Sequence, residues 1–357
     1  MNLEDLLKKT VENEASDLHV TVGTPPRIRK SGKLLELGEE KLSAEKVKEL
    51  IESKMSPAQI KNFNDGFEID YSIGLPGISR FRVNIYSQRG NICAAYRRLP
   101  LEPPAIDSLG LPDAVVNLID QKKGLILVTG STGSGKSTTM AALVNKLTKE
   151  LPGHILTIED PIEFLYPHSK AQVNQREVGV DTKSFASGLK SALRQDPDVV
   201  VVGELRDPES MAAAMSVAET GHLVFGTMHT NTAAGAVNRL VDAFPPDKQD
   251  VIRTNLSMSL LAVIAQQLIP TNSGGRALAC EILIATPAIK ALIRENNVHQ
   301  INNYIKSGGK DGMTLMDDTL MKLFKDGTIS QEHMIEYAID PTAMENSVGS
   351  IPKQPNI

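Results

Sequence analysis

The pattern of hydrophobic and polar residues over the first hundred positions mixes helical and strand spacing. Some apolar residues recur every three or four positions, as they do on one face of an amphipathic helix. Others alternate with polar residues, as at 81–86, which is the pattern of a half-buried strand. The expected elements are helices at 3–11 and 44–55 and strands at 17–22, 81–86 and 92–98. Residues 1–100 are therefore predicted to form a small α+β domain.

A run of prolines separates this domain from a different pattern. Four prolines between positions 100 and 112 predict a stiff linker at 101–113. Beyond it, continuous apolar runs rich in β-branched residues alternate with helical segments, which is typical of a parallel sheet covered by helices. The sequence predicts an α/β core at 114–286 and a helical region at 287–357, with a frayed end from Met344. The expected core strands are 124–128, 155–158, 199–202 and 223–225.

One motif lies directly between the first of these strands and a helix. Residues 130–137, GSTGSGKS, fit the phosphate-binding pattern G-x-x-x-x-G-K-[ST]. Its glycines let backbone amides close around nucleotide phosphates at the positive end of the helix dipole. Lys136 is expected to reach the β and γ phosphates, and the Ser137 hydroxyl to bind Mg²⁺. The predicted nucleotide contacts are Ser131, Thr132, Gly133, Ser134, Gly135, Lys136, Ser137 and Thr138.

Carboxylates follow two of the predicted core strands. The strand at 199–202 continues into Gly203 and Glu204, where Glu204 could orient Mg²⁺ through water or polarise the attacking water. The segment 158–164 carries three carboxylates after another strand, at the edge of an α/β sheet where ligands bind. Glu163 is the preferred base within it, although a solvated acidic loop is the alternative. The sequence does not decide between Glu163 and Glu204 as the base.

A third segment, 220–231, is a buried strand with a histidine near each end. His229 lies among polar residues that could contact a γ-phosphate, and it is a candidate sensor of that group. The alternative is a histidine that only forms hydrogen bonds at a strand end, and for His222 both interpretations are equally open. Two histidines seven positions apart do not match helix-spaced metal ligands.

Composition narrows the class of protein. The chain has 357 residues, 41% hydrophobic and 23% charged, as expected for a globular protein of about two domains. Its 38 basic and 43 acidic residues give a net charge of −5, which offers no overall attraction to nucleic acid or anionic lipid. Cys93 and Cys280 are too few for a disulfide framework or a cysteine-rich zinc site. No transmembrane segment or secretory signal is evident, so we expect a cytoplasmic protein that reaches a membrane only through a partner.

The order of these motifs resembles the secretion and type IV pilus ATPases. The phosphate-binding loop, the acidic segment 158–164, the strand at 199–207 and the histidine segment 220–231 follow one another as in that family. Residues 15–19 also resemble the family's small N-terminal domain, so the resemblance covers nearly the whole chain. It implies a RecA-like core, a PAS-like N-terminal domain, and ATP hydrolysis with Mg²⁺ in a homohexamer.

Two features resemble the PilT-type retraction branch of that family. The chain begins directly with the small domain and lacks the paired Cys-x-x-Cys insertion common in assembly and secretion motors. Residues 288–295 resemble the branch's A-I-R-x-L-I-R-E signature, although Lys290 stands where arginine is usual and cannot make a bidentate contact. The same segment also fits a plain core helix. The branch implies type IV pilus retraction by a motor at the cytoplasmic face of the inner membrane, docked on the pilus platform protein.

The resemblance also implies that arginines of the N-terminal domain complete a neighbouring subunit's site. Arg80, Arg82, Arg97 and Arg98 are the candidates, and Arg82 and Arg97 are preferred. A guanidinium near the γ-phosphate would stabilise transition-state charge and tie turnover to the pivoting of the two domains about the proline-rich linker. Strand arginines that only face solvent are the alternative.

Two other functions remain open. A motor of the same family could extend pili or drive type II secretion. A RecA-like nucleic-acid translocase would share the phosphate-binding loop, but it should carry a basic stripe and stacking aromatic residues. This chain has 4% aromatic residues, no tryptophan and a pI of about 5.9, which count against that function.

Overall fold

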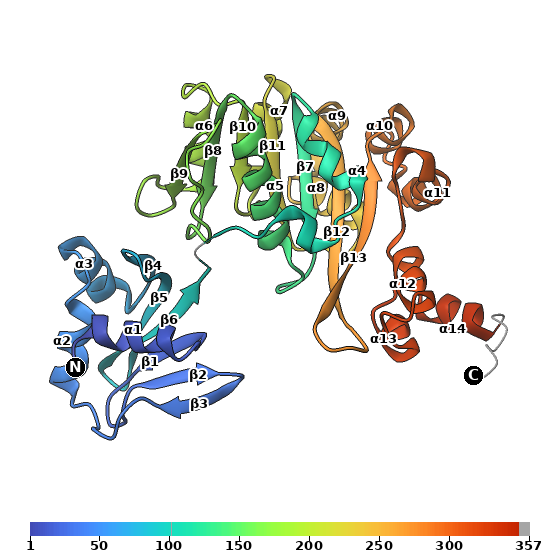
Figure 1. Ribbon diagram of the computed structural model, residues 1–357. Coiled ribbons are helices and arrows are strands. Elements are labelled where there is room, and N and C mark those ends of the chain that lie inside the picture. Colours follow the sequence, from blue (N-terminus) through green and yellow to red (C-terminus); the bar gives the residue numbers. More distant parts are fainter. Residues whose placement is uncertain (101, 350–357) are drawn as a thin grey trace. The chain divides into compact units, whose positions relative to one another are not determined.

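The computed structural model describes residues 1–100 and 102–349 and divides into two compact units (Figure 1). The first unit contains Met1–Glu102 together with Pro161–Leu165, and the second contains Pro103–Asp160 and the chain from Tyr166 onward. Each unit has its own hydrophobic core.

The first unit is built on a six-stranded antiparallel sheet with the strand order β3-β2-β1-β6-β5-β4. Phe81, Val83 and Ile85 of β5 are fully buried, and they pack with apolar residues of α1 and α2 such as Leu7 and Ile51. The predicted α+β fold is confirmed. The elements are α1 (Leu3–Glu12), β1 (Asp17–Val20), β2 (Arg27–Lys30), β3 (Lys33–Glu36), α2 (Ala44–Glu52), α3 (Pro57–Gly66), β4 (Glu68–Leu75), β5 (Ser79–Gln88) and β6 (Asn91–Leu99).

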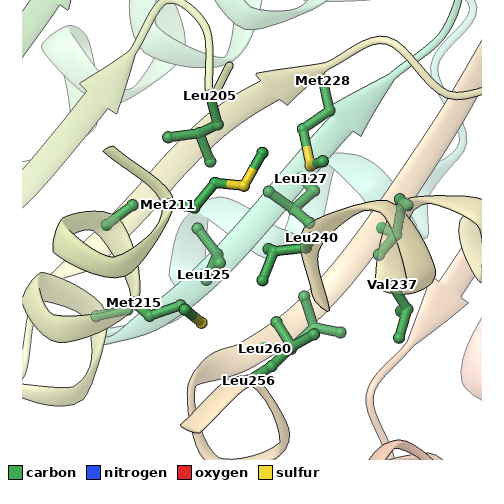
Figure 2. Close-up of a cluster of buried hydrophobic side chains, with 14 of the residues drawn as sticks. Leu125, Leu127, Leu205, Met211, Met215, Met228, Val237, Leu240, Leu256 and Leu260 are labelled. Atoms are coloured by element: carbon green, nitrogen blue, oxygen red, sulfur yellow. The ribbon is translucent and has the colours of Figure 1, made fainter. Parts of the chain in front are cut away.

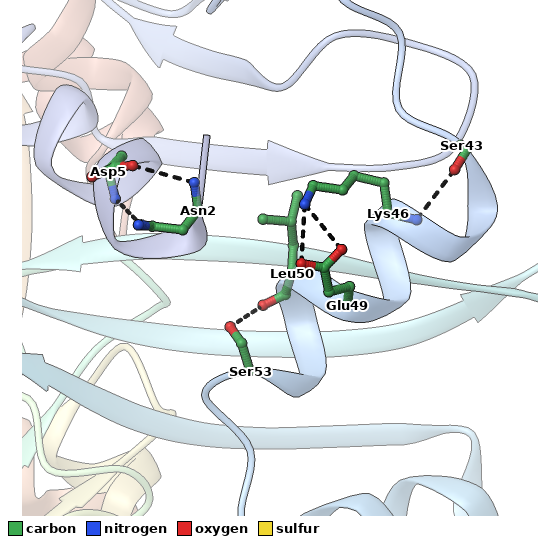
Figure 3. Close-up of polar contacts among 7 residues, drawn as sticks. All are labelled: Asn2, Asp5, Ser43, Lys46, Glu49, Leu50 and Ser53. Carbon is green, nitrogen blue, oxygen red and sulfur yellow. Dashed lines mark hydrogen bonds and ion pairs between the residues drawn. The ribbon is translucent and has the colours of Figure 1, made fainter.

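Polar side chains fix the ends of the first two helices (Figure 3). Asn2 and Asp5 form a capping box, because the Asn2 side chain accepts the Asp5 amide at 2.8 Å and Asp5 accepts the Asn2 amide at 3.2 Å. Ser43 caps α2 by accepting an amide of its first turn. The hydroxyl of Ser53 then bonds the preceding turn, and α2 ends at Glu52, three residues before the predicted end at 55.

The second unit is built on a seven-stranded sheet with the order β13-β12-β7-β11-β10-β8-β9. All its strand pairs are parallel except β12 with β13. The four predicted core strands correspond to β7, β8, β10 and β11. Its elements up to β13 are η1 (Ile106–Leu109), α4 (Asp113–Val116), η2 (Asn117–Asp120), β7 (Gly124–Thr129), α5 (Lys136–Glu150), β8 (His154–Glu159), β9 (Gln172–Glu177), α6 (Phe185–Ala192), β10 (Val199–Val202), α7 (Pro208–Glu219), β11 (Leu223–Met228), α8 (Ala233–Asp242), η3 (Pro246–Lys248), α9 (Gln249–Ser259), β12 (Leu260–Pro270) and β13 (Arg276–Ile284).

Apolar layers cover both faces of this sheet, as strands that are apolar throughout require. In β7, Leu125 and Leu127 belong to one layer, whereas Ile126 and Val128 belong to the other. The predicted α/β core is therefore confirmed. Figure 2 shows the first layer, to which α7, α8 and α9 contribute Met211, Met215, Val237, Leu240 and Leu256.

The proline-rich segment does not form the stiff linker that we expected over 101–113. From Pro103 onward it belongs to the second unit, and the short helix η1 packs against α5. Ile106 and Leu111 pack against the apolar layer to which α5 contributes. The linker prediction counted the prolines but not these apolar side chains, which hold the segment on the core.

The chain beyond β13 is helical, as predicted. The helix α12 packs on β13, and Met316, Leu320 and Met334 form a small core with Ile269 of β12. The end that we expected to be frayed from Met344 is helical as far as residue 349, and residues 350–357 lie outside the described chain. The elements are α10 (Pro287–Arg294), η4 (Val298–Gln300), α11 (Ile301–Ser307), η5 (Gly309–Asp311), α12 (Met316–Lys325), α13 (Gln331–Glu336) and α14 (Pro341–Gly349).

None of the helices that the structure describes combines the length and the apolar character needed to cross a lipid bilayer.

Candidate nucleotide site

The phosphate-binding motif occupies the turn between β7 and α5, where the sequence predicts it. Residues 130–135 connect the two elements. Gly130 has a φ of 146°, and a Cβ atom there would collide with the backbone oxygen of Gln266 and the hydroxyl of Ser134. Gly135, directly before α5, has a φ of 94°. Glycine is therefore required at both ends of this loop for its backbone conformation, and at Gly130 also for its close approach to β12.

The polar groups of the loop fit a nucleotide phosphate. The ammonium of Lys136 donates to the carbonyl oxygens of Gly130 and Ser131 at 2.8 and 2.9 Å. The hydroxyl of Ser134 is buried, and within the described chain it has no hydrogen-bond partner. Buried hydroxyls are normally paired in folded proteins, and a phosphate oxygen would supply the missing partner. The N-terminus of α5 adds the amides and the positive dipole end that bind anions.

The remaining predicted contact residues lie around this turn. Ser131, Thr132 and Gly133 are exposed, so they are open to a ligand. Ser137 is exposed in the first turn of α5, and Thr138 is partly buried. Over residues 1–100 and 102–349 no group of three or more His, Cys, Asp or Glu side chains could hold a metal ion by itself. A hydroxyl fits Mg²⁺, which takes few protein ligands and completes its shell with phosphate and water oxygens.

The structure brings two further predicted residues, Glu204 and His229, into direct contact. Glu204 follows β10 and His229 follows β11, which is the parallel neighbour of β10. The Nε2 atom of His229 lies 3.1 Å from Oε1 of Glu204. Thr227 ties the two strand ends together, because its hydroxyl donates to the carbonyl of Gly203 and its own carbonyl accepts the amide of Leu205 at 2.9 Å. The Glu204–His229 pair is thus fixed by the sheet.

Arg206 is a third member of this group, and the sequence analysis missed it. Its Nη2 atom lies 2.7 Å from Oε2 of Glu204, so each oxygen of that carboxylate has a partner. The hydrogen bond and the charge of Glu204 raise the pKa of Arg206 above its usual value. The signal was its position two residues after Glu204, in the sequence GELRD. The Arg206 side chain is 71% exposed, whereas that of Glu204 is 18% exposed.

The acidic segment 158–164 is divided between the two units. Glu159 ends β8 in the second unit, where its Oε1 accepts hydrogen bonds from Thr157 at 2.7 Å and Gln175 at 3.2 Å. Glu163 belongs to Pro161–Leu165, which groups with the first unit. The two candidate bases, Glu163 and Glu204, are therefore carried by different units.

Arg82 and Arg97 are direct neighbours across β5 and β6, on the polar face of the first unit's sheet. The Nε atom of Arg97 lies 2.9 Å from Oδ1 of Asp17, and that of Arg82 lies 3.6 Å from Oδ1 of Asp70. Partial burial raises the pKa of Asp17, but hydrogen bonds from Ser16 and Arg97 outweigh it, and the pKa is lower than usual. Both arginines remain substantially exposed, at 43% for Arg82 and 71% for Arg97.

The other two arginines lie in different surroundings. Arg80 shares the face of Arg82, and it donates to the Ile162 carbonyl at 3.1 Å and to the Ser72 hydroxyl at 3.0 Å. Arg98 follows Arg97 in the same strand, so its side chain leaves the opposite face of the sheet. Arg98 is therefore not part of the group formed by Arg82 and Arg97.

The sequence also pointed to His222 and to Lys290, and the structure shows the contacts of the first and the burial of the second. The Nδ1 atom of His222 lies 3.0 Å from the Val217 carbonyl and 3.2 Å from the Thr220 hydroxyl, at the opposite end of β11 from His229. His222 therefore has the role of a hydrogen-bonding residue before a strand. Lys290 is partly buried in α10, whose Ile289 and Ile293 are fully buried. The segment 288–295 is thus a helix with one face in the core.

The chain is similar to a known family and to proteins of known name. Residues 2–274 match the family described as type II/IV secretion system protein. The chain is 45% identical to the type IV pilus retraction ATPase PilT of Pseudomonas aeruginosa, over 96% of this chain and 99% of that protein. It is 46% identical to a twitching motility protein of Neisseria gonorrhoeae, over 86% of this chain and 82% of that protein.

The fold is similar to that of a solved member of the same group. A crystal structure of the pilus retraction motor PilT with bound ADP matches with a TM-score of 0.91 and 45% identity. The match covers 97% of this chain and 99% of that one. The RecA-like core, the small N-terminal domain and the helical C-terminal region that the sequence predicted are thereby confirmed. The chain belongs to the type II/IV secretion system protein family and is a nucleotide-binding P-loop ATPase.

Proposed function

We propose that this chain is the ATPase motor that retracts type IV pili and thereby drives twitching motility. Its similarity along nearly the full length to the retraction ATPase of Pseudomonas aeruginosa supports the direction of work. The observation that carries the chemistry is the contact of Glu204 with His229 at the ends of two neighbouring core strands. The match to the retraction ATPase covers 96% of this chain and 99% of the relative, which favours retraction over the alternatives of pilus extension, type II secretion and nucleic-acid translocation.

ATP binds in the loop 130–137. Lys136 exchanges its bonds to the loop carbonyls for bonds to phosphate oxygens, which are stronger because both partners are charged. The Ser137 hydroxyl, and Glu204 through water, would hold Mg²⁺, which would supply positive charge against the phosphate oxygens. The backbone amides at the start of α5 bind the same oxygens.

Glu204 orients the attacking water, and His229 reports whether a γ-phosphate is present. A carboxylate whose oxygens contact His229 at 3.1 Å and Arg206 at 2.7 Å has a restricted orientation. Contact of His229 with the γ-phosphate changes its bond to Glu204 and so links phosphate binding to the position of the base. Glu163 is the alternative base, carried by the other unit.

The working form is a homohexamer in which each subunit completes its neighbour's site. Arg82 and Arg97 support this arrangement, because they lie together on one sheet face and remain exposed. Their guanidinium groups stabilise charge on the γ-phosphate of the adjacent subunit. Hydrolysis then depends on the position of residues 1–100 relative to the core 114–286, and it drives motion between them.

The motor acts at the cytoplasmic face of the inner membrane. It docks there on the platform protein of the pilus, and its force reaches the filament through that partner. This location follows from the proposed role in pilus retraction.

The direct test deletes the gene in the organism that encodes it and counts surface pili by electron microscopy. We expect more pili and loss of surface motility, both reversed by the wild-type gene but not by Lys136→Ala. Bald cells would show that the motor extends pili. An unchanged count with normal motility would show that it serves another process. Either of these results contradicts the proposal.

A further inference from the structure

A buried carboxylate outside the nucleotide loop joins the starts of two helices. Glu281 lies in β13 and is 3% exposed. Its Oε1 atom accepts the amide of Ala233 at 2.7 Å, and its Oε2 atom accepts the amide of Met316 at 3.4 Å. Ala233 is the first residue of α8, and Met316 is the first residue of α12. One side chain therefore satisfies amides at the N-termini of two helices that are far apart in sequence.

The first of these helices begins directly after the segment that carries His229. β11 ends at Met228, and residues 229–232 lead into α8. Thr232 caps the helix by accepting the Gly235 amide at 3.1 Å, which leaves the Ala233 amide for Glu281. The segment with His229 is thus held at one end by the sheet and at the other by the Glu281 carboxylate.

The second helix has no side-chain cap of its own. Leu315 precedes α12 and supplies no capping bond, so Glu281 takes that place. Thr319 of α12 also donates to the Cys280 carbonyl of β13 at 2.8 Å. Asp317 accepts the amides of Ile339 and Asp340 at 2.7 and 3.0 Å, just before α14.

A carboxylate in this position is costly to the fold. Burial raises the pKa of Glu281, and the two amide bonds only partly offset that effect. Several other helices are capped by an adjacent serine, threonine or aspartate, as Asp207 caps α7. Such a local cap would satisfy an amide without burying a charge, but it would not hold α8 and α12 to the same point of β13.

We propose that Glu281 is a positioning residue for His229, fixing the segment 229–232 against β13 and coupling it to the C-terminal helices through α12. This inference rests on the role proposed for His229 in ATP turnover. Without the carboxylate, the segment 229–232 should become more mobile. The nucleotide loop lies between β7 and α5, so it should still bind ATP.

The test compares Glu281→Met, which accepts no hydrogen bond, with Glu281→Gln, which keeps one acceptor. We expect kcat for ATP hydrolysis to fall about tenfold or more in Glu281→Met, with a smaller fall in Glu281→Gln and little change in KM. Thr319→Val is the matched control, because it removes a bond between α12 and β13 without touching α8, and it should keep wild-type kcat. Amide hydrogen exchange at 229–233 should become faster in both Glu281 variants.

The same assay with His229→Ala separates the role proposed for His229 from the role proposed for Glu281. If Glu281 acts through His229, adding Glu281→Gln to His229→Ala should slow the enzyme no further. If the double variant lost the product of the two single losses in kcat, the positioning role would be overturned. Wild-type kcat in Glu281→Gln, together with a reduced kcat in His229→Ala, would overturn it as well. Wild-type kcat in His229→Ala itself would refute the role of His229 and this inference with it. If Glu281→Met does not fold, Glu281→Gln alone decides.

Discussion

The two carboxylate oxygens of Glu204 contact a histidine and an arginine that are both more exposed than Glu204 itself. His229 is 45% exposed and Arg206 is 71% exposed, whereas the Glu204 side chain is 18% exposed. Exposed ion pairs contribute little to stability, so these partners can be exchanged for a ligand at low cost. The arrangement keeps the carboxylate oriented while leaving both partners free to respond to phosphate.

Asp17 provides a prediction at the same scale. Its pKa is lowered in the folded protein, so its contribution to stability is present above the pKa of the unfolded chain and is lost as pH falls through the folded value. We expect Asp17→Asn to lower the free energy of unfolding by about 1 kcal/mol at pH 7, through loss of the charged bond with Arg97. The difference from the wild type should shrink towards zero at low pH, where the carboxyl of Asp17 is protonated in the folded and the unfolded chain.

Urea unfolding at the two pH values measures this effect. Asp65→Asn in α3 is the control, because Asp65 is exposed and its substitution should leave the unfolding free energy unchanged at both values. A loss in Asp17→Asn that is equally large at pH 7 and at low pH would show that the carboxylate charge is not responsible.

Among the elements, the loop between β7 and α5 is the most tightly constrained. A side chain at Gly130 would meet both the Gln266 backbone of β12 and Ser134 of the loop itself. We expect Gly130→Ala to weaken ATP binding about tenfold or more, because the loop must move away from β12 and misplace its amides. Gly309→Ala, where a Cβ atom meets nothing within 4 Å, should bind as the wild type does in a nucleotide titration. Equal affinity in both variants would contradict this account of the loop.

Sequence patterns predicted the central strands because these strands are apolar throughout. Val199–Val202 is buried at all four positions, and β7 at all six, so continuous apolar runs marked them clearly. The edge strand β9, with the sequence QVNQRE, carries mostly polar residues and gave no such pattern. In this core the continuous apolar pattern reports burial on both faces, but β12, buried throughout 262–266, was not predicted.

Site residues that directly follow a strand could be predicted from the sequence. Contacts that depend on which strands are neighbours in the sheet could not. Glu204 and His229 were each predicted separately, but their contact depends on β10 and β11 being neighbours in the sheet. Arg206 was marked only by its position two residues after Glu204, and Glu281 only by the partners that it has in the structure. The register of β5 and β6 likewise places Arg97 directly opposite Arg82.

For the whole molecule, the candidate chemistry is distributed over two units. Arg82, Arg97 and Glu163 belong to the first unit, whereas Lys136 and Glu204 belong to the second. In the proposed function, hydrolysis needs residues of both units, and such a division suits a motor.

Mixing two inactive variants tests whether a neighbour supplies the arginine. Arg97→Ala and Glu204→Gln should each lose most ATP hydrolysis alone. In mixed rings, a subunit with Glu204→Gln offers an intact Arg97 to a neighbour with an intact Glu204, so part of the activity should return. Asp17→Asn keeps Arg97 but removes the carboxylate that pairs with it, so it is the control for local disturbance. This variant should hydrolyse ATP by itself, without mixing. Mixtures as inactive as their parts would contradict completion between subunits.

The most direct test of the central claim is single-turnover ATP hydrolysis by Glu204→Gln, measured together with ATP affinity and compared with Glu163→Gln. We predict that Glu204→Gln binds ATP with near wild-type affinity but hydrolyses it about a hundredfold or more slowly, as expected for loss of a base. Wild-type hydrolysis in Glu204→Gln, with the loss appearing in Glu163→Gln instead, would contradict the account and transfer the base to the other unit.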